Sequence, residues 1–120
     1  MNAKESILFV YNADGSYLGK AKDFVHKIVS SSTYQCNLCK MTYGSVFMNS
    51  QWKKFVEELP ATIRFLHKDE FERSYPEYLT DYPVALREKN DQLNIFISTD
   101  EMNGFENLDE LIHAVGNKLN

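Results

Sequence analysis

The sequence predicts one α/β domain, in which a central four-stranded mixed sheet is flanked by helices. Residues 7–11 form a short apolar run without polar alternation, which is typical of a strand buried on both faces. Residues 16–30 and 107–119 carry apolar residues at helical spacing, so each is expected to pack one face on the sheet. The chain has 120 residues, enough for one hydrophobic core, and we expect a single domain over residues 1–120.

The first half of the chain predicts one strand and two helices. Turn-forming residues separate the apolar run from the helix expected over residues 16–30. Residues 33–44 predict a loop with one helical turn. Asn49 or Ser50 then caps a second helix, which ends at Pro60. The apolar face of this helix comprises Trp52, Phe55, Val56 and Leu59.

A second strand and a short helix are expected next. Residues 62–66 alternate apolar and polar side chains, which predicts a strand, and residues 68–75 predict a short helix that ends before a proline. Between them, His67 beside Asp69 and Glu70 offers the residue types of a general base. Acids at the start of a helix also complement its dipole, so we favour a structural role for these three residues.

The last third of the chain predicts a hairpin and a terminal helix. Residues 84–87 and 93–97 are expected to be strands, joined by a turn at residues 89–92 and paired antiparallel. Pro83 can introduce the first of them, because the N–H of that position need not pair. Asn107 begins the helix with a capping pattern, since a glutamate follows three residues later.

Composition and charge argue against nucleic-acid and membrane partners. The net charge is −4, and the basic residues are scattered, with only Lys53 and Lys54 adjacent. No apolar run approaches the ~18 residues that a membrane span needs. The first apolar run is too short for the core of a signal peptide, so we expect a cytoplasmic protein. Its expected partner is an unidentified protein or small molecule.

Four short motifs are distributed along most of the chain. They are Tyr11-Asn12-Ala13-Asp14, Thr33-Tyr34-Gln35-Cys36-Asn37-Leu38-Cys39, Thr42-Tyr43-Gly44 and Leu66-His67-Lys68-Asp69-Glu70-Phe71. Together with the order of the predicted elements, these motifs resemble an uncharacterised bacterial family related to thioredoxins. The resemblance implies a thioredoxin-like fold but no specific activity. It also puts Pro83, preceded by Tyr82, where thioredoxins keep a cis proline.

The only two cysteines, Cys36 and Cys39, are spaced C-x-x-C. A structural disulfide is uncommon in a reducing cytoplasm, so the pair is redox-active, metal-binding or simply two small buried residues. As a redox pair, Cys36 would attack and Cys39 would resolve, with Lys40 favouring the thiolate. No histidine lies at zinc-finger spacing from the pair. Thiol–disulfide exchange or redox sensing is the first hypothesis. A metal-binding C-x-x-C protein stays an alternative, and we assign no metal site and no cofactor.

The position of the cysteines departs from the thioredoxin pattern. In thioredoxins the C-x-x-C motif follows the first long strand and opens the first helix, whereas here that place holds Asp14 and Ser16 and no sulfur. Loops beyond the carboxyl ends of strands are where open α/β sheets bind ligands. A non-catalytic thioredoxin-like module is therefore the alternative hypothesis. Its partner or small ligand would bind at Asn12, Asp14, Ser16 and Pro83, with Pro83 close to the loop rather than to Cys36.

Overall fold

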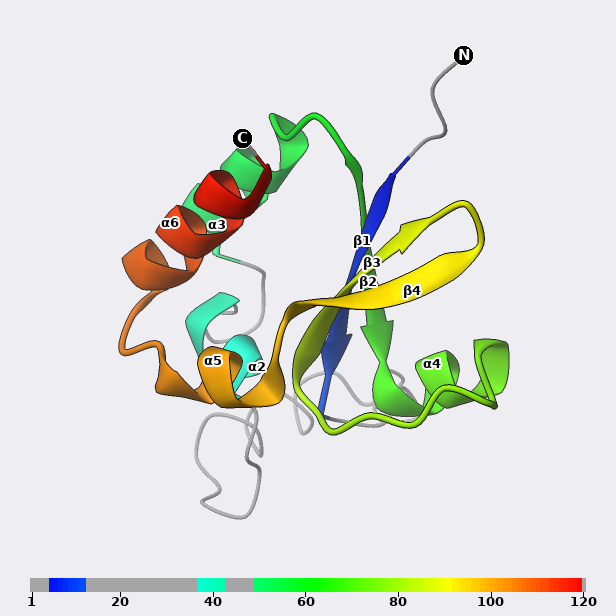
Figure 1. Ribbon diagram of the computed structural model, residues 1–120. Coiled ribbons are helices and arrows are strands. Elements are labelled where there is room, and N and C mark those ends of the chain that lie inside the picture. Colours follow the sequence, from blue (N-terminus) through cyan, green and yellow to red (C-terminus); the bar gives the residue numbers. More distant parts are fainter. Residues whose placement is uncertain (1–4, 13–36, 43–48, 120) are drawn as a thin grey trace.

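The centre of the fold is a four-stranded mixed sheet (Figure 1). The computed structural model describes residues 5–12, 37–42 and 49–119. The strands are β1 (Ser6–Tyr11), β2 (Thr62–His67), β3 (Val84–Lys89) and β4 (Gln92–Ile97). They lie in the order β2-β1-β3-β4, with β1 parallel to β2 and antiparallel to β3, and β3 antiparallel to β4. The four predicted strands and the antiparallel pairing of the last two are confirmed.

β1 is the most buried strand of the sheet. It lies between β2 and β3, and the side chains of Ile7, Leu8, Phe9 and Val10 are all fully buried. Alternate residues of a strand point to opposite faces, so a strand that is covered on both faces needs apolar side chains at every position. This explains why the sequence of β1 shows no polar alternation.

Among the described residues, four helices cover one face of the sheet (Figure 1). They are α2 (Asn37–Thr42), α3 (Ser50–Glu57), α5 (Thr99–Gly104) and α6 (Leu108–Leu119). Phe9 projects from β1 into the core that these helices form, and its ring meets the ring of Trp52 edge to face, with the centroids 5.3 Å apart. Leu111 and Val115 bury the inner side of α6 in the same core. The predicted packing of the last helix on the sheet is thus confirmed.

The second face of the sheet is covered by α4 (Lys68–Ser74) and by the chain that follows it (Figure 1). Leu8 and Val10 of β1 pack there with Phe71, the buried residue of α4. The ring of Tyr75 stacks on Phe71, with centroids 5.0 Å apart, and the Tyr75 hydroxyl donates a 2.9 Å hydrogen bond to the Glu88 carboxylate of β3. Among the described residues, fewer side chains are buried in this second core than in the first.

The observed helices agree with most of the helices predicted from sequence. Asn49 caps α3, because its Oδ1 accepts hydrogen bonds from the backbone N–H groups of Gln51 and Trp52, at 2.8 and 3.1 Å. α4 and α6 match the helices predicted over residues 68–75 and 107–119, and α2 is the helical turn expected within residues 33–44. The helix predicted over residues 16–30 lies outside the described residues.

Helix α5 was not predicted from the sequence. It begins after Ser98, whose Oγ accepts a hydrogen bond from the Glu101 N–H while the Glu101 carboxylate accepts one from the Ser98 N–H. This reciprocal pair is a capping box, and the spacing of Ser98 and Glu101 was the available signal. The helix was missed because it is only six residues long and has a single buried side chain, Met102, so it shows no apolar periodicity.

The turn between β3 and β4 holds two residues in the left-handed region. Asn90 has a φ of 55° and Asp91 a φ of 64°, and the flanking residues Lys89 and Gln92 are paired across the hairpin. Positive φ at both central residues is the pattern of a type I′ turn, which matches the twist of the two strands. Asparagine and aspartate tolerate this conformation better than other residues that carry a Cβ.

Replacing Asp91 by glycine should stabilise the protein. Glycine adopts positive φ without steric cost, so we expect Asp91→Gly to raise the free energy of unfolding by ~0.5 kcal/mol, after allowance for its greater freedom in the unfolded chain. The matched variant Asp91→Ala removes the same carboxylate but keeps a Cβ, and should lower that free energy by ~1 kcal/mol. Urea denaturation measures both. Equal stability of the two variants would show that the turn conformation does not limit this position.

Candidate functional site

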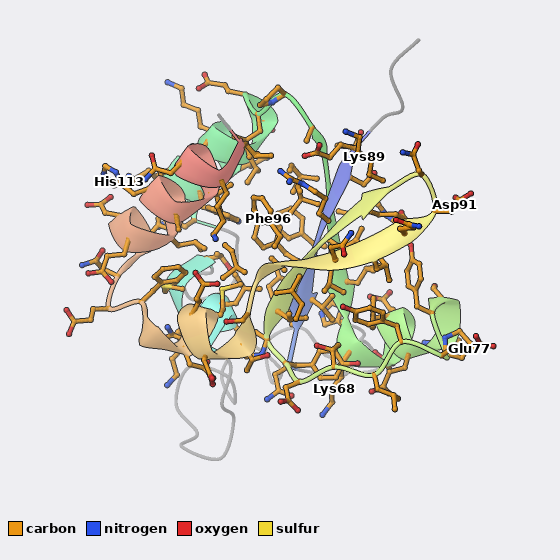
Figure 2. All side chains as sticks on the ribbon, viewed as in Figure 1. Lys68, Glu77, Lys89, Asp91, Phe96 and His113 are labelled. Atoms are coloured by element: carbon orange, nitrogen blue, oxygen red, sulfur yellow. The ribbon has the colours of Figure 1, made fainter. Side chains whose placement is uncertain are left out.

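The carboxyl ends of the two parallel strands lie side by side. The last residue of β1, Tyr11, is in register with His67, the last residue of β2. The next residues along each strand also meet, because Lys68 Nζ lies 3.5 Å from Asn12 Oδ1. Figure 2 shows Lys68 at the start of α4, below the ends of the strands. This edge is the place where open α/β sheets bind ligands.

Pro83 lies at the same end of the sheet. The Tyr82–Pro83 peptide bond is cis, which confirms the isomer expected from the resemblance. Val84 is in register with Val10 of β1, and the two strands run antiparallel. Pro83, the residue before Val84, therefore lies at the level of Tyr11, the residue after Val10. The structure therefore brings Asn12 and Pro83, two predicted ligand-binding residues, to one edge of the fold. The other two, Asp14 and Ser16, lie outside the described residues, so their expected proximity to Pro83 stays a prediction.

His67 and Glu70 form a compact pair at this edge. The Glu70 carboxylate accepts a 2.8 Å hydrogen bond from the His67 backbone N–H and lies 3.0 Å from Nδ1 of the His67 ring. The backbone hydrogen bond is the main reason that the pKa of Glu70 lies below its ordinary value, and the nearby ring adds to the effect while partial burial opposes it. His67 is buried and its ring lies 5.5 Å from the ring of Tyr11. This geometry fits the structural role favoured for His67 and Glu70, in which the acid caps the start of α4.

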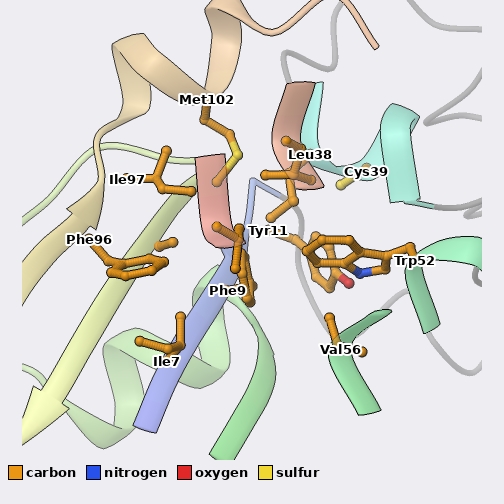
Figure 3. Close-up of a cluster of buried hydrophobic side chains, with 13 residues drawn as sticks. Ile7, Phe9, Tyr11, Leu38, Cys39, Trp52, Val56, Phe96, Ile97 and Met102 are labelled. Atoms are coloured by element: carbon orange, nitrogen blue, oxygen red, sulfur yellow. The ribbon is translucent and has the colours of Figure 1, made fainter. Parts of the chain in front are cut away.

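Cys39 lies in the core next to the end of β1. Its side chain is only 3% exposed and belongs to the cluster that includes Tyr11, Leu38 and Trp52 (Figure 3). Helix α2, which carries Cys39, therefore packs against the same end of the sheet that holds Asn12 and Pro83. Cys36 lies outside the described residues, so the arrangement of the C-x-x-C pair stays a prediction.

The residue that follows Cys36 in the sequence, Asn37, anchors the start of α2. Its side-chain Nδ2 donates hydrogen bonds to the backbone carbonyl oxygens of Met102 and Phe105, both at 2.8 Å. These carbonyls belong to the end of α5 and the residue after it, where a helix leaves its last acceptors unpaired. Sequence reasoning missed this role because the partners lie more than sixty residues away in the chain.

Comparisons with known proteins add no relative, since no family model, no curated protein and no solved structure matches the chain. Over residues 5–12, 37–42 and 49–119, no three histidine, cysteine or acidic side chains converge in a way that could hold a metal ion. Among the helices in those same ranges, none has both the length and the apolar character to cross a membrane. The function of the site is therefore inferred from its own geometry.

Replacing Glu70 by glutamine should make the free energy of unfolding depend less on pH in the acidic range. The pKa of Glu70 in the folded protein lies below its ordinary value of 4.5, so its charged form stabilises the fold above that pH, and this contribution is lost as the pH falls through the lowered pKa. We expect Glu70→Gln to lower the free energy of unfolding by ~0.5–1 kcal/mol at neutral pH and by much less near pH ~3. Urea denaturation at a series of pH values measures the difference.

The exposed Glu77 offers a matched control for this experiment. Glu77→Gln changes the net charge equally but does not touch the start of α4, so its profile should run parallel to that of the parent. A loss of stability in Glu70→Gln that is the same at neutral and acidic pH would contradict the capping role of the carboxylate.

The anchor made by Asn37 can be tested by a change of one atom type. Asn37→Asp puts an oxygen opposite the carbonyls of Met102 and Phe105 and removes both hydrogen bonds, so we expect the free energy of unfolding to fall by ~2 kcal/mol or more. The same change at the exposed Asn103, on α5, should have little effect. Thermal and urea denaturation measure both variants, and equal stabilities would rule out the anchor.

Proposed function

We propose that the chain is a thioredoxin-like protein that carries out thiol–disulfide exchange through its C-x-x-C pair, with Cys36 as the attacking thiol and Cys39 as the resolving thiol. The observation that carries the proposal is the position of Cys39 in the cluster around Tyr11, at the end of β1. The cysteine segment is displaced along the sequence from the usual place in thioredoxins. Its second cysteine nevertheless lies in the core next to the end of β1, which is also the end of the sheet that Asn12 and Pro83 occupy.

The arrangement of the sheet supports the thioredoxin-like part of this proposal. A parallel pair, β1 and β2, is continued by an antiparallel hairpin, β3 and β4, and the last helix packs back on the sheet. This is the order of strands that the proposed bacterial thioredoxin-like family would have. A cytoplasmic location accords with the proposed chemistry, because a reducing compartment keeps an exchanging dithiol supplied with electrons.

The burial of Cys39 suits a resolving thiol better than an attacking one. Cys39 is only 3% exposed in an apolar cluster, so its sulfur cannot reach a disulfide on another protein. In the proposed reaction, the Cys36 thiolate attacks a substrate disulfide, forming a mixed disulfide and releasing one substrate thiolate. The Cys39 thiolate then attacks the Cys36 sulfur, which forms the Cys36–Cys39 disulfide and releases the second substrate thiolate. The substrate gains two electrons, and a low-molecular-weight thiol returns the protein to its dithiol form.

A second candidate function is the binding of a partner or small ligand without catalysis. It is favoured by the polar groups of Asn12 and Lys68, which lie 3.5 Å apart beyond the parallel strands. Such a module would use the polar groups of Asn12 and Lys68, beside the buried Pro83, as a recognition surface, and Cys39 would be a core residue only. The two candidates differ in whether the thiols react.

The thiol proposal predicts a clear asymmetry between the two cysteine variants. In mildly oxidising glutathione buffer, Cys39→Ser should accumulate a mixed disulfide between Cys36 and glutathione, because the resolving thiol is absent. Cys36→Ser should be modified at least ~10-fold more slowly, because Cys39 is buried. Mass spectrometry of the intact protein measures both. Trp52 is the only tryptophan and shares the cluster of Cys39, so its fluorescence should report the oxidation of the parent.

Equal rates of modification in the two variants, or a parent that stays reduced in the same buffer, would contradict the thiol proposal. Metal analysis of the purified parent serves as a control, and bound zinc that is lost in both variants would support the metal-binding alternative instead. Unreactive cysteines without metal would leave the binding module as the function to pursue.

A further inference from the structure

The outer strand β4 presents an uncharged edge. Its six residues, Gln92 to Ile97, include no acidic or basic side chain, and within the part of the chain that the structure describes no strand pairs with its far side (Figure 1). Ile95 is 58% exposed, and with Leu79 it makes up the exposed large hydrophobic side chains of the described residues. Natural proteins usually protect such an edge with charges or proline. β4 has neither along its length.

The hairpin determines which backbone groups of β4 face the open edge. Lys89 and Gln92 flank a two-residue turn, so they form a hydrogen-bonded pair, and such pairs alternate with non-hydrogen-bonded pairs along the ladder. Asn94, which is in register with Arg87, therefore also directs its N–H and C=O to β3. The N–H and C=O of Leu93 and Ile95 point the other way, to the edge.

A bulge limits this open segment at one end. Ile95 is in register with Leu86, whereas Ala85 is in register with Ile97, so Phe96 is an extra residue on β4. Phe96 is buried, and the guanidinium of Arg87 lies 5.1 Å from the centre of its ring. Figure 2 shows Phe96 turned toward the core, away from the tip of the hairpin. The regular part of the edge is thus centred on Asn94.

We propose that two copies of the chain pair through β4 about a two-fold axis at Asn94, forming one continuous sheet. In this antiparallel register, Leu93 of one copy lies opposite Ile95 of the second copy, and the reverse pair lies on the other side of the axis. Both residues direct their backbone groups outward, so the register creates four hydrogen bonds between the copies. Leu93 packs on the second core, and the exposed Ile95 lies two residues further along the same face of β4. In the paired sheet, each Ile95 would contact Leu93 of the second copy, which extends this apolar surface across the axis.

The charges near the axis are compatible with pairing of identical copies. β4 brings no like charges opposite one another, which would otherwise oppose an antiparallel pair. Two of the charged side chains on the neighbouring strand, Arg87 and Glu88, are already matched within one copy. Arg87 Nε lies 2.9 Å from a Glu5 carboxylate oxygen, and Glu88 lies 4.0 Å from Arg64. Because the β4 edge carries no charge, the β4 edge of a second copy can lie against it without repulsion.

The short interface implies weak association. A single pair of strands with one apolar contact on each side of the axis buries less than the ~1,200 Å² of a standard stable interface. We therefore expect a dimer whose dissociation constant is micromolar or weaker, and which is favoured by salt that screens the net charge of −4.

Sedimentation equilibrium of the full chain, with reductant present to exclude intermolecular disulfides, tests the proposal. The parent should shift from monomer to dimer as its concentration rises to ~1 mM, and Ile95→Lys should weaken this association at least ~10-fold. Leu79→Lys is the matched control, because it adds the same charge at an exposed leucine outside β4 and should leave the association unchanged. Hydrogen exchange should show concentration-dependent protection of the Leu93 and Ile95 amides, but not of the Asn94 amide, which already faces β3.

Three results would overturn the pairing. A parent that remains monomeric at ~1 mM would do so directly. Association that Leu79→Lys weakens as much as Ile95→Lys would place the contact elsewhere. A dimer in which the Leu93 and Ile95 amides gain no protection would exclude β4 as its interface.

Discussion

The burial of β1 is the constraint on which the rest of the structure depends. Its alternate residues belong to two cores: Ile7, Phe9 and Tyr11 pack with α2, α3, α5 and α6, whereas Leu8 and Val10 pack with α4. A strand with no exposed side chain must be covered on both faces and paired on both sides, because its backbone groups are as far from water as its side chains. The mixed sheet meets this need with β2 on one side and β3 on the other.

The end of β1 also determines where chemistry can occur. From Ile7 to Val10 the side chains of the strand are apolar and fully buried, and beyond the Tyr11 ring the strand is followed by the polar side chain of Asn12. The same register brings His67 and Lys68 to this end from β2, while Pro83 arrives from the antiparallel side. The Cys39 sulfur lies in the adjacent apolar cluster rather than among these polar groups. A resolving thiol can be buried, because it attacks only the sulfur of the neighbouring cysteine. The attacking thiol must be open to a substrate, so the pair would need to lie close to an accessible edge.

The parts of the fold that the sequence predicted correctly are those with local signals. The strands were recognisable from apolar runs and alternation, and α3 from the cap at Asn49 and its apolar face. The parts that could not be predicted depend on distant contacts. The two hydrogen bonds of Asn37 join segments more than sixty residues apart, and no pattern around Asn37 indicates its partners. The approach of Lys68 to Asn12 likewise follows from the pairing of β1 with β2 and from no local motif.

One continuous path of contacts connects the open edge of the sheet to the cysteine helix. β4 ends at Ile97, and Ser98 then caps α5 directly, with no intervening loop. The end of α5 in turn accepts two hydrogen bonds from the Asn37 side chain, and the buried Cys39 follows Asn37 two residues later in α2. Short, fully hydrogen-bonded connections transmit position better than loops do, because fewer torsion angles can absorb a displacement. A second copy seated on β4 would therefore stiffen the element against which α2 is anchored. The proposed pairing and the proposed exchange use different surfaces, and the short helix α5 lies between them in this path of contacts.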